Sequence, residues 1–449
     1  MTDTIIRNVR IFIGGKLREG NVLIEDGRIE RISKVVSKIP YTGSLDQVVE
    51  GRGDLVLPGG IDVHVHFRGM GEEMKEDWYT GSCAAAAGGV TTVIDHPNTD
   101  PPLLSRRDFH RRLVDAERMS IIDFGLNGGV CVENIERLSE LWHIGVTSFG
   151  EIFMADGGRL GLGHSDLERC LSEISGLGAI ACIHAEDDET NRRLSRKYGK
   201  SRDPRVYSII RPPESEEIAV KEALDLGKKT KLHFCHISTM NAVSLIRRVK
   251  DGGGDVTCEV TPHHLFLSTI EYERLGSYAK TNPPLRDPEH QPALWRGLNE
   301  RTIDIIASDH APHTIEEKER GIHDAPPGVT GVETLIPLML AAAKDGRISL
   351  ERLIEATRLN PAERFTLTPH QKGGIEVGND ADLIIINTES PRTIRGEELH
   401  SKAGWTPFEG MEALFPRITM LRGSIIWDDG PAVKRGNGNF LHGAGAIQV

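Results

Sequence analysis

Two histidines near the start of the chain have the spacing of a metal site. His64 and His66 stand in the segment Asp62-Val63-His64-Val65-His66-Phe67-Arg68. Successive side chains of an extended strand point to opposite faces, so these two imidazoles point to the same side. Two neutral imidazoles on one face provide half of the donors that a divalent transition metal needs. Two core histidines satisfied by hydrogen bonds are the alternative, because so short a motif often arises by chance.

Further possible donors occur where other predicted strands end. They are Glu151 in Ser148-Phe-Gly-Glu-Ile-Phe-Met, His184 in Cys182-Ile-His-Ala-Glu, His236 in His233-Phe-Cys-His-Ile-Ser and Asp309 in Ala307-Ser-Asp-His-Ala-Pro-His313. Four imidazoles and two carboxylates suffice for two metal ions. Each position alone could be structural, but their shared placement favours a metal centre. We expect zinc, as one or two ions, although manganese, cobalt and iron accept the same donors.

These donors need a scaffold that brings the ends of several strands together. From about residue 55 to 372, apolar strands alternate with helical stretches such as 105–118, 214–227 and 350–359. The strand candidates end near His66, Asp95, Asn127, Glu151, His184, His236, Glu259 and Ser308. Eight strand-then-helix units predict an α/β fold, a (β/α)8 TIM-type barrel, whose catalytic residues lie at the C-terminal ends of the strands.

Strand-like segments with tight turns flank the predicted barrel on both sides. Residues 4–33 contain turns at Gly14-Gly15 and Asp26-Gly27, and apolar strands return at 382–386, 418–420 and 424–426. We expect a small β-sandwich domain built from residues 1–54 and 373–449 around a barrel of residues 55–372. The tail from Gly436 to Val449 is rich in glycine and is expected to be loosely ordered.

Composition narrows the class of protein. The chain has 449 residues, 38% hydrophobic content and a formal net charge of −12, which suits a globular enzyme with a small-molecule substrate and disfavours nucleic-acid binding. It has no run long enough to span a membrane and no signal peptide at Met1, so we expect a cytoplasmic protein, possibly a homo-oligomer. The six cysteines form no CxxC pair and are expected to be reduced and buried.

Several longer motifs point to one family. They are Pro58-Gly-Gly-Ile-Asp-Val-His-Val-His-Phe-Arg, Ala85-Ala-Ala-Gly-Gly-Val-Thr-Thr-Val-Ile-Asp, Pro97-Asn-Thr-Asp-Pro-Pro, Thr281-Asn-Pro-Pro-Leu-Arg and Ser308-Asp-His-Ala-Pro-His. Together they resemble the cyclic amidohydrolase group of the amidohydrolase superfamily, and within it the dihydroorotases, over the chain up to about residue 430. The resemblance implies reversible cyclisation of N-carbamoyl-L-aspartate to L-dihydroorotate in pyrimidine biosynthesis. A metal-bound hydroxide would attack the ring amide, with Asp309 as general acid and base.

Two positions depart from the family pattern. Many relatives bridge their metals with a carboxylated lysine on strand four, whereas this chain has Glu151 there. A glutamate is shorter but still offers two oxygens, so the number of metal ions depends on this residue. The alternative is that Glu151 lies near the site without binding metal. His96 replaces the methionine that relatives usually carry and is not assigned as a ligand.

The choice of substrate depends on residues around the predicted metal centre. Arg68 follows His66 by two residues, and its guanidinium suits a carboxylate; a salt bridge to Glu72 or Glu73 is the alternative. By the resemblance, Arg68, Asn98 and His313 hold the ring carboxylate and Asn282 contacts the amide groups. The rings that hydantoinases and allantoinases cleave need no such clamp, and such an activity is the first rival. A noncatalytic scaffold that has lost its metal is the second.

Overall fold

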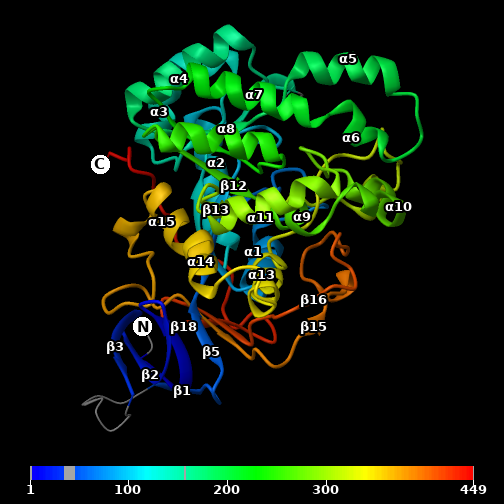
Figure 1. The fold of residues 1–449 in the computed structure, drawn as a ribbon. Coiled ribbons are helices and arrows are strands. Elements are labelled where there is room, and N and C mark those ends of the chain that lie inside the picture. The colour runs from blue at the N-terminus through cyan, green and yellow to red at the C-terminus, as the bar shows by residue number, and fades with distance from the viewer. Residues whose placement is uncertain (1–2, 35–45, 156–157, 448–449) are drawn as a thin grey trace.

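Parallel strands in the middle of the chain close into a barrel (Figure 1). The computed structural model describes residues 3–34, 46–155 and 158–447. Within these ranges the barrel strands are β6 (Gly60–Val65), β7 (Val90–Asp95), β8 (Asp123–Leu126), β9 (Phe149–Phe153), β10 (Ile180–His184), β11 (Lys231–Phe234), β12 (Val256–Val260) and β13 (Ile305–Ile306). They form two parallel sheets, β6 to β8 and β9 to β13. Single bridges between Val65 and His310 and between Gly128 and Phe149 close the ring, which confirms the expected barrel.

Helices cover the outside of this ring (Figure 1). They are α1 (Trp78–Ala87), α2 (Arg106–Met119), α3 (Leu138–His143), α4 (His164–Leu177), α5 (Asp188–Tyr198), α6 (Val206–Ile210), α7 (Pro213–Leu226), α8 (Met240–Asp251), α9 (Pro262–Phe266), α10 (Tyr272–Leu275), α11 (Gln291–Asn299), α12 (Ile315–Lys318), α13 (Leu335–Lys344), α14 (Leu350–Ile354) and α15 (Asn360–Arg364). The predicted helices 105–118 and 214–227 correspond to α2 and α7, and α14 continues as a π-helical turn, Glu355–Leu359. Because helices cover the strands, β6 and β7 are buried along their whole length.

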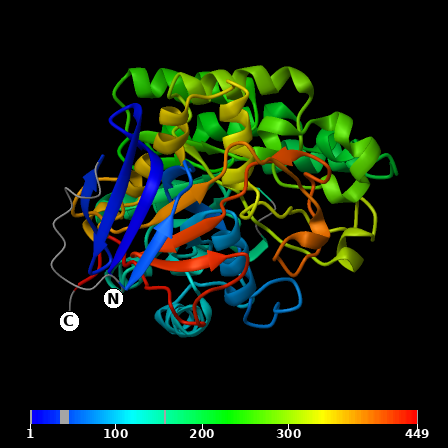
Figure 2. The same ribbon diagram turned by 90° about the horizontal axis from the view of Figure 1, so that it is seen from below.

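A second sheet combines both ends of the chain, with blue N-terminal and orange to red C-terminal strands in one layer (Figure 2). Its strands are β1 (Thr4–Ile13), β2 (Lys16–Glu25), β3 (Arg28–Ser33), β4 (Gln47–Glu50), β5 (Leu55–Pro58), β14 (Leu383–Ile386), β17 (Ile418–Leu421) and β18 (Ser424–Asp428). The order is β18-β17-β14-β5-β1-β2-β3, with β4 beside β1. A separate hairpin pairs β15 (Arg392–Thr393) with β16 (Glu412–Ala413).

The sheet has an apolar core of its own, to which Ile6, Val22, Leu383 and Ile418 contribute. We propose the division into a β domain of 1–54 and 373–449 and a barrel of 55–372. Strand β5 lies at the first of these boundaries and pairs with β1 and β14, so the chain passes from the sheet into the barrel directly after it.

One buried lysine joins the sheet to the barrel. Lys372 Nζ lies 2.6 Å from Asp123 on β8 and 3.0 Å from both Asp380 and Asp382, next to β14. Burial disfavours the ammonium, but the three carboxylates outweigh it and raise the pKa of Lys372. Arg358 adds a contact of 3.2 Å to Asp382. Removing one member would leave a buried charge without its partner, which is strongly destabilising.

The cysteines and the helices bear on two further features expected from the sequence. All six cysteines lie in the described ranges and are buried and free. Across the described residues, none of the helices combines the length and the apolar character that crossing a membrane requires.

The expectation of a loose C-terminal tail is wrong for residues 436–447; residues 448–449 lie outside the described ranges. On β8, the Phe124 N–H donates a hydrogen bond to Asn439 O of the tail, and the Phe124 carbonyl accepts one from the Leu441 N–H. The Leu441 side chain is buried. Glycine makes this close approach possible, because a Cβ on Gly438 would lie 1.8 Å from Ile122 O and one on Gly443 would lie 2.1 Å from Val146 O. The glycines therefore indicate tight packing here.

Deletion of residues 436–449 should lower the melting temperature by several degrees. The truncated chain loses the contacts of Phe440 with Phe109 and Phe124 and the buried Leu441 side chain, and full burial of one such side chain contributes about 1.5–3 kcal/mol. Thermal unfolding of the two chains measures the difference, and a chain lacking only 448–449 is the control. Equal melting temperatures for the full-length and 436–449-deleted chains would show that the tail contributes nothing.

Candidate metal centre and substrate site

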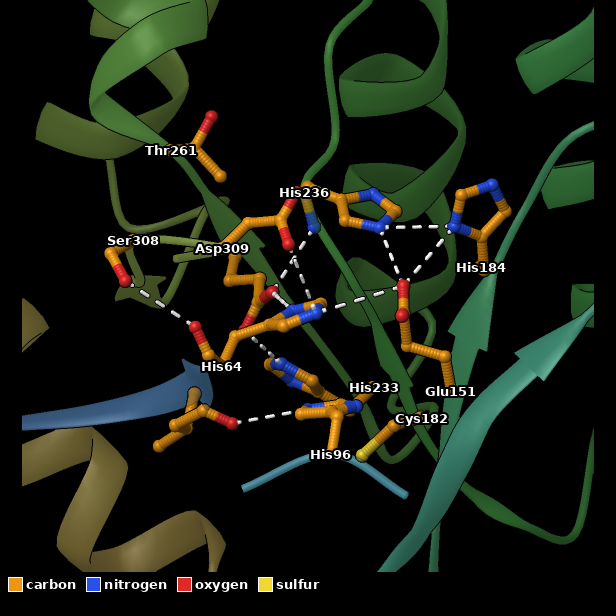
Figure 3. A network of polar contacts seen from close by, with 12 residues as sticks. His64, His96, Glu151, Cys182, His184, His233, His236, Thr261, Ser308 and Asp309 are labelled. Atoms are coloured by element: carbon orange, nitrogen blue, oxygen red, sulfur yellow. Dashed lines mark hydrogen bonds and ion pairs between the residues drawn. The ribbon is translucent and has the colours of Figure 1, made fainter. Parts of the chain in front are cut away.

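The Glu151 carboxylate lies among imidazoles at the C-terminal ends of the barrel strands, and Figure 3 shows it facing His64, His184 and His236. Its Oε1 atom is 3.1 Å from His184 Nδ1, 2.8 Å from His236 Nε2 and 3.6 Å from His64 Nε2. Its Oε2 atom is 3.8 Å from His66 Nε2. All five side chains are buried. Glu151 is therefore shared between the histidines of β6 and those that end β10 and follow β11.

Asp309 completes the set of predicted donors. Its Oδ1 atom is 3.2 Å from His66 Nε2 and 3.6 Å from His64 Nε2. Two groups thus have their ligand atoms within 4.8 Å of one another: His64, His66 and Asp309, and His64, Glu151 and His236. The structure brings all six sequence-predicted donors together, with His184 joined to the second group through Glu151.

The donor atoms fit a divalent cation better than they fit each other. His64 Nε2 is buried and has no hydrogen-bond partner among the described residues, although Glu151 and Asp309 both lie 3.6 Å away. That separation is too long for a hydrogen bond. Ligands held about 2.1 Å from a tetrahedral zinc ion lie about 3.4 Å from one another. A cation among these atoms would satisfy the unpartnered nitrogen and both carboxylates.

The site strongly favours positive charge. Burial alone would raise the pKa of Glu151, but His64, His184 and His236 hold it well below its usual range. Burial likewise opposes protonation of His184, yet Glu151 and Glu186 raise its pKa to about 9. A bound cation would supply this positive charge in place of protons.

Three residues of the site have backbones in the left-handed region. The φ angles are +40° for Arg68, +33° for His236 and +48° for Asp309. Each such conformation costs a residue other than glycine on the order of 1–3 kcal/mol, and such outliers cluster at functional sites. All three residues lie shortly after the end of a barrel strand. The surrounding barrel must therefore stabilise their backbone conformations.

Sequence reasoning did not identify Glu259, whose carboxylate contacts His64, as a functional residue. Glu259, at the end of β12, lies with Oε1 2.5 Å from His64 Nδ1, and its Oε2 is 3.0 Å from His233 Nε2. An imidazole that donates its Nδ1–H to a carboxylate presents its Nε2 lone pair to a metal. The available signal was the place of Glu259 at a strand end, the same position that identified the donors.

Glu186 has the same role behind His184. Its Oε2 is 3.0 Å from His184 Nε2, which leaves Nδ1 directed to Glu151. Arg211 holds the Glu186 carboxylate with two nitrogens, Nε at 3.0 Å and the terminal NH2 group in close contact. The sequence placed Glu186 only two residues after His184, but gave no sign of its pairing with Arg211.

His96, which was not assigned as a ligand, lies directly beside His64. Its ring stacks on that of His64 with centroids 3.9 Å apart, and its Nε2 lies 3.2 Å from Val63 O. Burial and the neighbouring His64 hold the pKa of His96 well below its usual range. A neutral ring there supports the orientation of His64.

Of the four predicted substrate residues, Arg68 and His313 lie together. The terminal NH2 group of Arg68 is 3.4 Å from His313 Nε2, and both side chains are buried. Within the described residues Arg68 makes no ion pair, and its buried Nε has no hydrogen-bond partner. Glu72 instead pairs with Lys75 at 2.6 Å. The guanidinium is therefore positioned to receive an anion, rather than being held in the alternative salt bridge.

The other two predicted substrate residues lie in loops. Asn98 is half-buried, and its Oδ1 atom has no hydrogen-bond partner in the described part of the chain. The Asn282 Oδ1 atom accepts a hydrogen bond of 2.5 Å from the Tyr207 hydroxyl on α6. This bond fixes the orientation of the Asn282 amide, a contact that the sequence did not indicate.

The amidohydrolase family model matches residues 55–425, and the chain belongs to the amidohydrolase family. A protein named dihydroorotase from Methanosarcina acetivorans is 50% identical over 455 residues, which cover 99% of this chain and 96% of that one. A dihydroorotase from Halobacterium salinarum is 39% identical over 91% of this chain and 96% of its own. The solved structure of L-hydantoinase (dihydropyrimidinase) from Arthrobacter aurescens has a TM-score of 0.93 at 32% identity and covers 98% of this chain and 100% of that one.

Replacing Glu259 by glutamine should weaken metal binding by about 10- to 100-fold, as is typical when the partner of a metal-binding histidine is changed. The neutral amide supports His64 less strongly as a donor. Competition with a chromophoric chelator measures the affinity. Glu333→Gln is the matched control, because Glu333 is also buried and bound to a histidine, His400, at 2.9 Å. Equal affinities of Glu259→Gln and the parent protein would remove Glu259 from the metal centre.

Proposed function

We propose that this protein is a dihydroorotase, which interconverts L-dihydroorotate and N-carbamoyl-L-aspartate in pyrimidine biosynthesis. The observation that carries the proposal is the buried Arg68 guanidinium, which lies beside His313 with an unpartnered Nε and follows the histidine pair of β6. Such a group suits the ring carboxylate of dihydroorotate. The two relatives named dihydroorotase, which match nearly the whole chain at 50% and 39% identity, support the same substrate.

We infer that the site holds a divalent metal as one or two ions, and the types of donor favour zinc. The proposed ligands are His64, His66, His184, His236, Glu151 and Asp309. When bound, such a cation polarises an amide carbonyl and makes water acidic enough to attack near neutral pH. Glu151 has Oε1 near His184, His236 and His64 and Oε2 near His66, so its carboxylate would be a metal ligand in the place where many relatives have a carboxylated lysine.

Asp309 is the proposed proton carrier. In hydrolysis, its carboxylate accepts a proton from the attacking water and returns it to the ring nitrogen as the amide C–N bond breaks. The hydroxyl group stays on the carbonyl carbon, which becomes the new carboxylate, and the nitrogen leaves as part of the carbamoyl group. Ring closure follows the same path in reverse, with Asp309 protonating the departing water.

Substrate residues orient the ring for this reaction. Arg68 and His313 would bind the carboxylate together with the Asn98 amide. Asn282, whose Oδ1 is occupied by Tyr207, would donate its remaining amide hydrogens to a ring carbonyl. A hydantoinase is the second candidate, because the L-hydantoinase structure from Arthrobacter aurescens aligns along nearly the whole chain with a TM-score of 0.93.

A panel of substrates tests the proposed function. The purified protein, reconstituted with zinc, is assayed with L-dihydroorotate, hydantoin and allantoin. We expect turnover of dihydroorotate and little of the other two. Turnover restricted to hydantoin or allantoin would overturn the substrate while leaving the metal centre in place. A protein that takes up no metal and acts on none of the three would favour the scaffold role instead.

Asp309→Asn should retain metal and lose most turnover. The amide oxygen still faces His66, but it cannot carry the proton, and general acid–base catalysis typically contributes about 10²–10⁴-fold to the rate. Steady-state kcat and metal content by elemental analysis are measured on the same sample. A variant with full activity would exclude the assigned role of Asp309.

Arg68→Met should raise KM for dihydroorotate by about 10- to 100-fold, since a hydrogen bond to a charged group contributes about 1.5–3 kcal/mol. Arg107→Met is the control, because Arg107 is exposed on α2. The same pair is assayed with hydantoin, whose ring has no carboxylate. If Arg68→Met gained hydantoin turnover and left dihydroorotate kinetics unchanged, the hydantoinase alternative would be favoured.

A further inference from the structure

Lys318 is a fully buried lysine at the end of α12, outside the metal centre. Its Nζ atom lies 3.1 Å from Lys280 O, 3.0 Å from Pro326 O and 2.9 Å from Gly328 O. Among the described residues it has no carboxylate partner within 4 Å. Burial of an ammonium group is costly unless its donors are satisfied. Here three backbone carbonyls satisfy all three donors, so the lysine holds backbone segments together rather than neutralising a charge.

The three carbonyls belong to the two segments that carry or support predicted substrate residues. Lys280 comes two residues before Asn282, and its carbonyl also accepts a hydrogen bond of 2.9 Å from the Gly328 N–H. In the chain, Pro327 stands between Pro326 and Gly328, and its carbonyl oxygen lies 3.1 Å from His313 Nε2. We call residues 280–282 and 326–328 the substrate wall. One ammonium group thus connects the surroundings of Asn282 to those of His313.

A tryptophan adds a second link between Lys318 and His313. The Trp405 ring centroid is 5.4 Å from Lys318 Nζ, within the range of a cation–π contact. Its Nε1–H donates a hydrogen bond of 2.8 Å to His313 O, and its own carbonyl accepts one of 2.9 Å from the Thr330 hydroxyl. The C-terminal part of the chain therefore contacts both Lys318 and His313 through one side chain.

The electrostatics of Lys318 agree with a positioning role. Burial, together with the nearby Lys280 ammonium, lowers the pKa of Lys318 to about 7, while Glu317 opposes this shift. Lys280 itself points elsewhere, with Nζ 3.0 Å from His323 O and 4.7 Å from the Tyr207 ring. The surroundings of Lys318 Nζ are therefore backbone carbonyls and an aromatic ring, and not the carboxylate that would stabilise its charge most.

We propose that Lys318 is a positioning residue for substrate recognition, which locks the two segments of the substrate wall together and so fixes Asn282 and His313 for the ring. This inference rests on the proposed function for the identity of the substrate. The hydrogen bonds of Lys318 Nζ go to three backbone carbonyls, and none of its contacts is with the metal donors. Its loss should therefore affect binding of the ring and leave the metal and the chemical step in place.

Lys318→Met tests this role, because it keeps the length of the side chain and removes the donors. We expect KM for dihydroorotate to rise about tenfold or more, with kcat within about threefold and metal content unchanged, the pattern of an interaction lost equally from the bound substrate and the transition state. An unchanged KM would overturn the proposal. A fall in kcat together with metal loss would also overturn it, because it would place Lys318 with the metal centre.

Amide hydrogen exchange gives a readout that does not depend on the substrate. Peptides covering 280–282 and 326–328 should exchange faster in Lys318→Met, the Gly328 N–H among them. Unchanged exchange in these peptides would contradict the positioning role of Lys318, whichever ring the enzyme cleaves. A failure of the proposed function would instead appear in the substrate panel of the parent protein.

Two further variants separate positioning from general loosening. Lys372→Met is the matched control, since Lys372 is equally buried but joins the sheet to the barrel. It should lower thermal stability without changing KM or exchange in the wall, and an equal rise in KM would overturn the specific role of Lys318. Should Lys318→Met fail to fold, Trp405→Phe removes the Nε1 donor to His313 and reduces the ring that faces Lys318, and it should raise KM severalfold; an unchanged KM in Trp405→Phe would contradict the proposal.

Discussion

The Glu151 carboxylate faces imidazoles from opposite sides of the barrel mouth, and the rest of the site is built around that contact. Its two oxygens lie within 4 Å of His64, His66, His184 and His236. A buried carboxylate can remain ionised only where positive charge surrounds it. The strand ends supply imidazoles that become charged or bind a cation, and the barrel is the scaffold that brings β6, β9, β10 and β11 to one point.

The orientation of these imidazoles is set from behind. Glu259 holds the far nitrogen of His64 and Glu186 holds the far nitrogen of His184, so each ring presents one chosen atom to the centre. Arg211 in turn balances the charge of Glu186. In the proposed function, binding and chemistry are separated in space: carboxylate–histidine pairs orient the proposed metal donors, whereas Arg68, His313 and the wall held by Lys318 would surround the ring.

The fold and the donors could largely be predicted from the sequence, because both depend on local patterns. The period of two in His64 and His66, and the repeated placement of donors at strand ends, needed only the geometry of a strand. Partners such as Arg211 and Lys318 could not be found this way, since their contacts are with residues or backbone carbonyls far along the chain. Composition was misleading for the tail. Its glycines were interpreted as a sign of loose order, but they allow Gly438 to lie close to Ile122, directly before β8.

The central proposal is that Glu151 binds the metal together with the histidines of the site, and anomalous diffraction from crystals of the zinc-loaded protein tests this most directly. The proposal predicts one or two peaks within reach of a Glu151 oxygen, among His64, His66 and Asp309 or beside His184 and His236. Peaks that lie away from Glu151, or bound zinc with neither histidine pair as ligands, would contradict it.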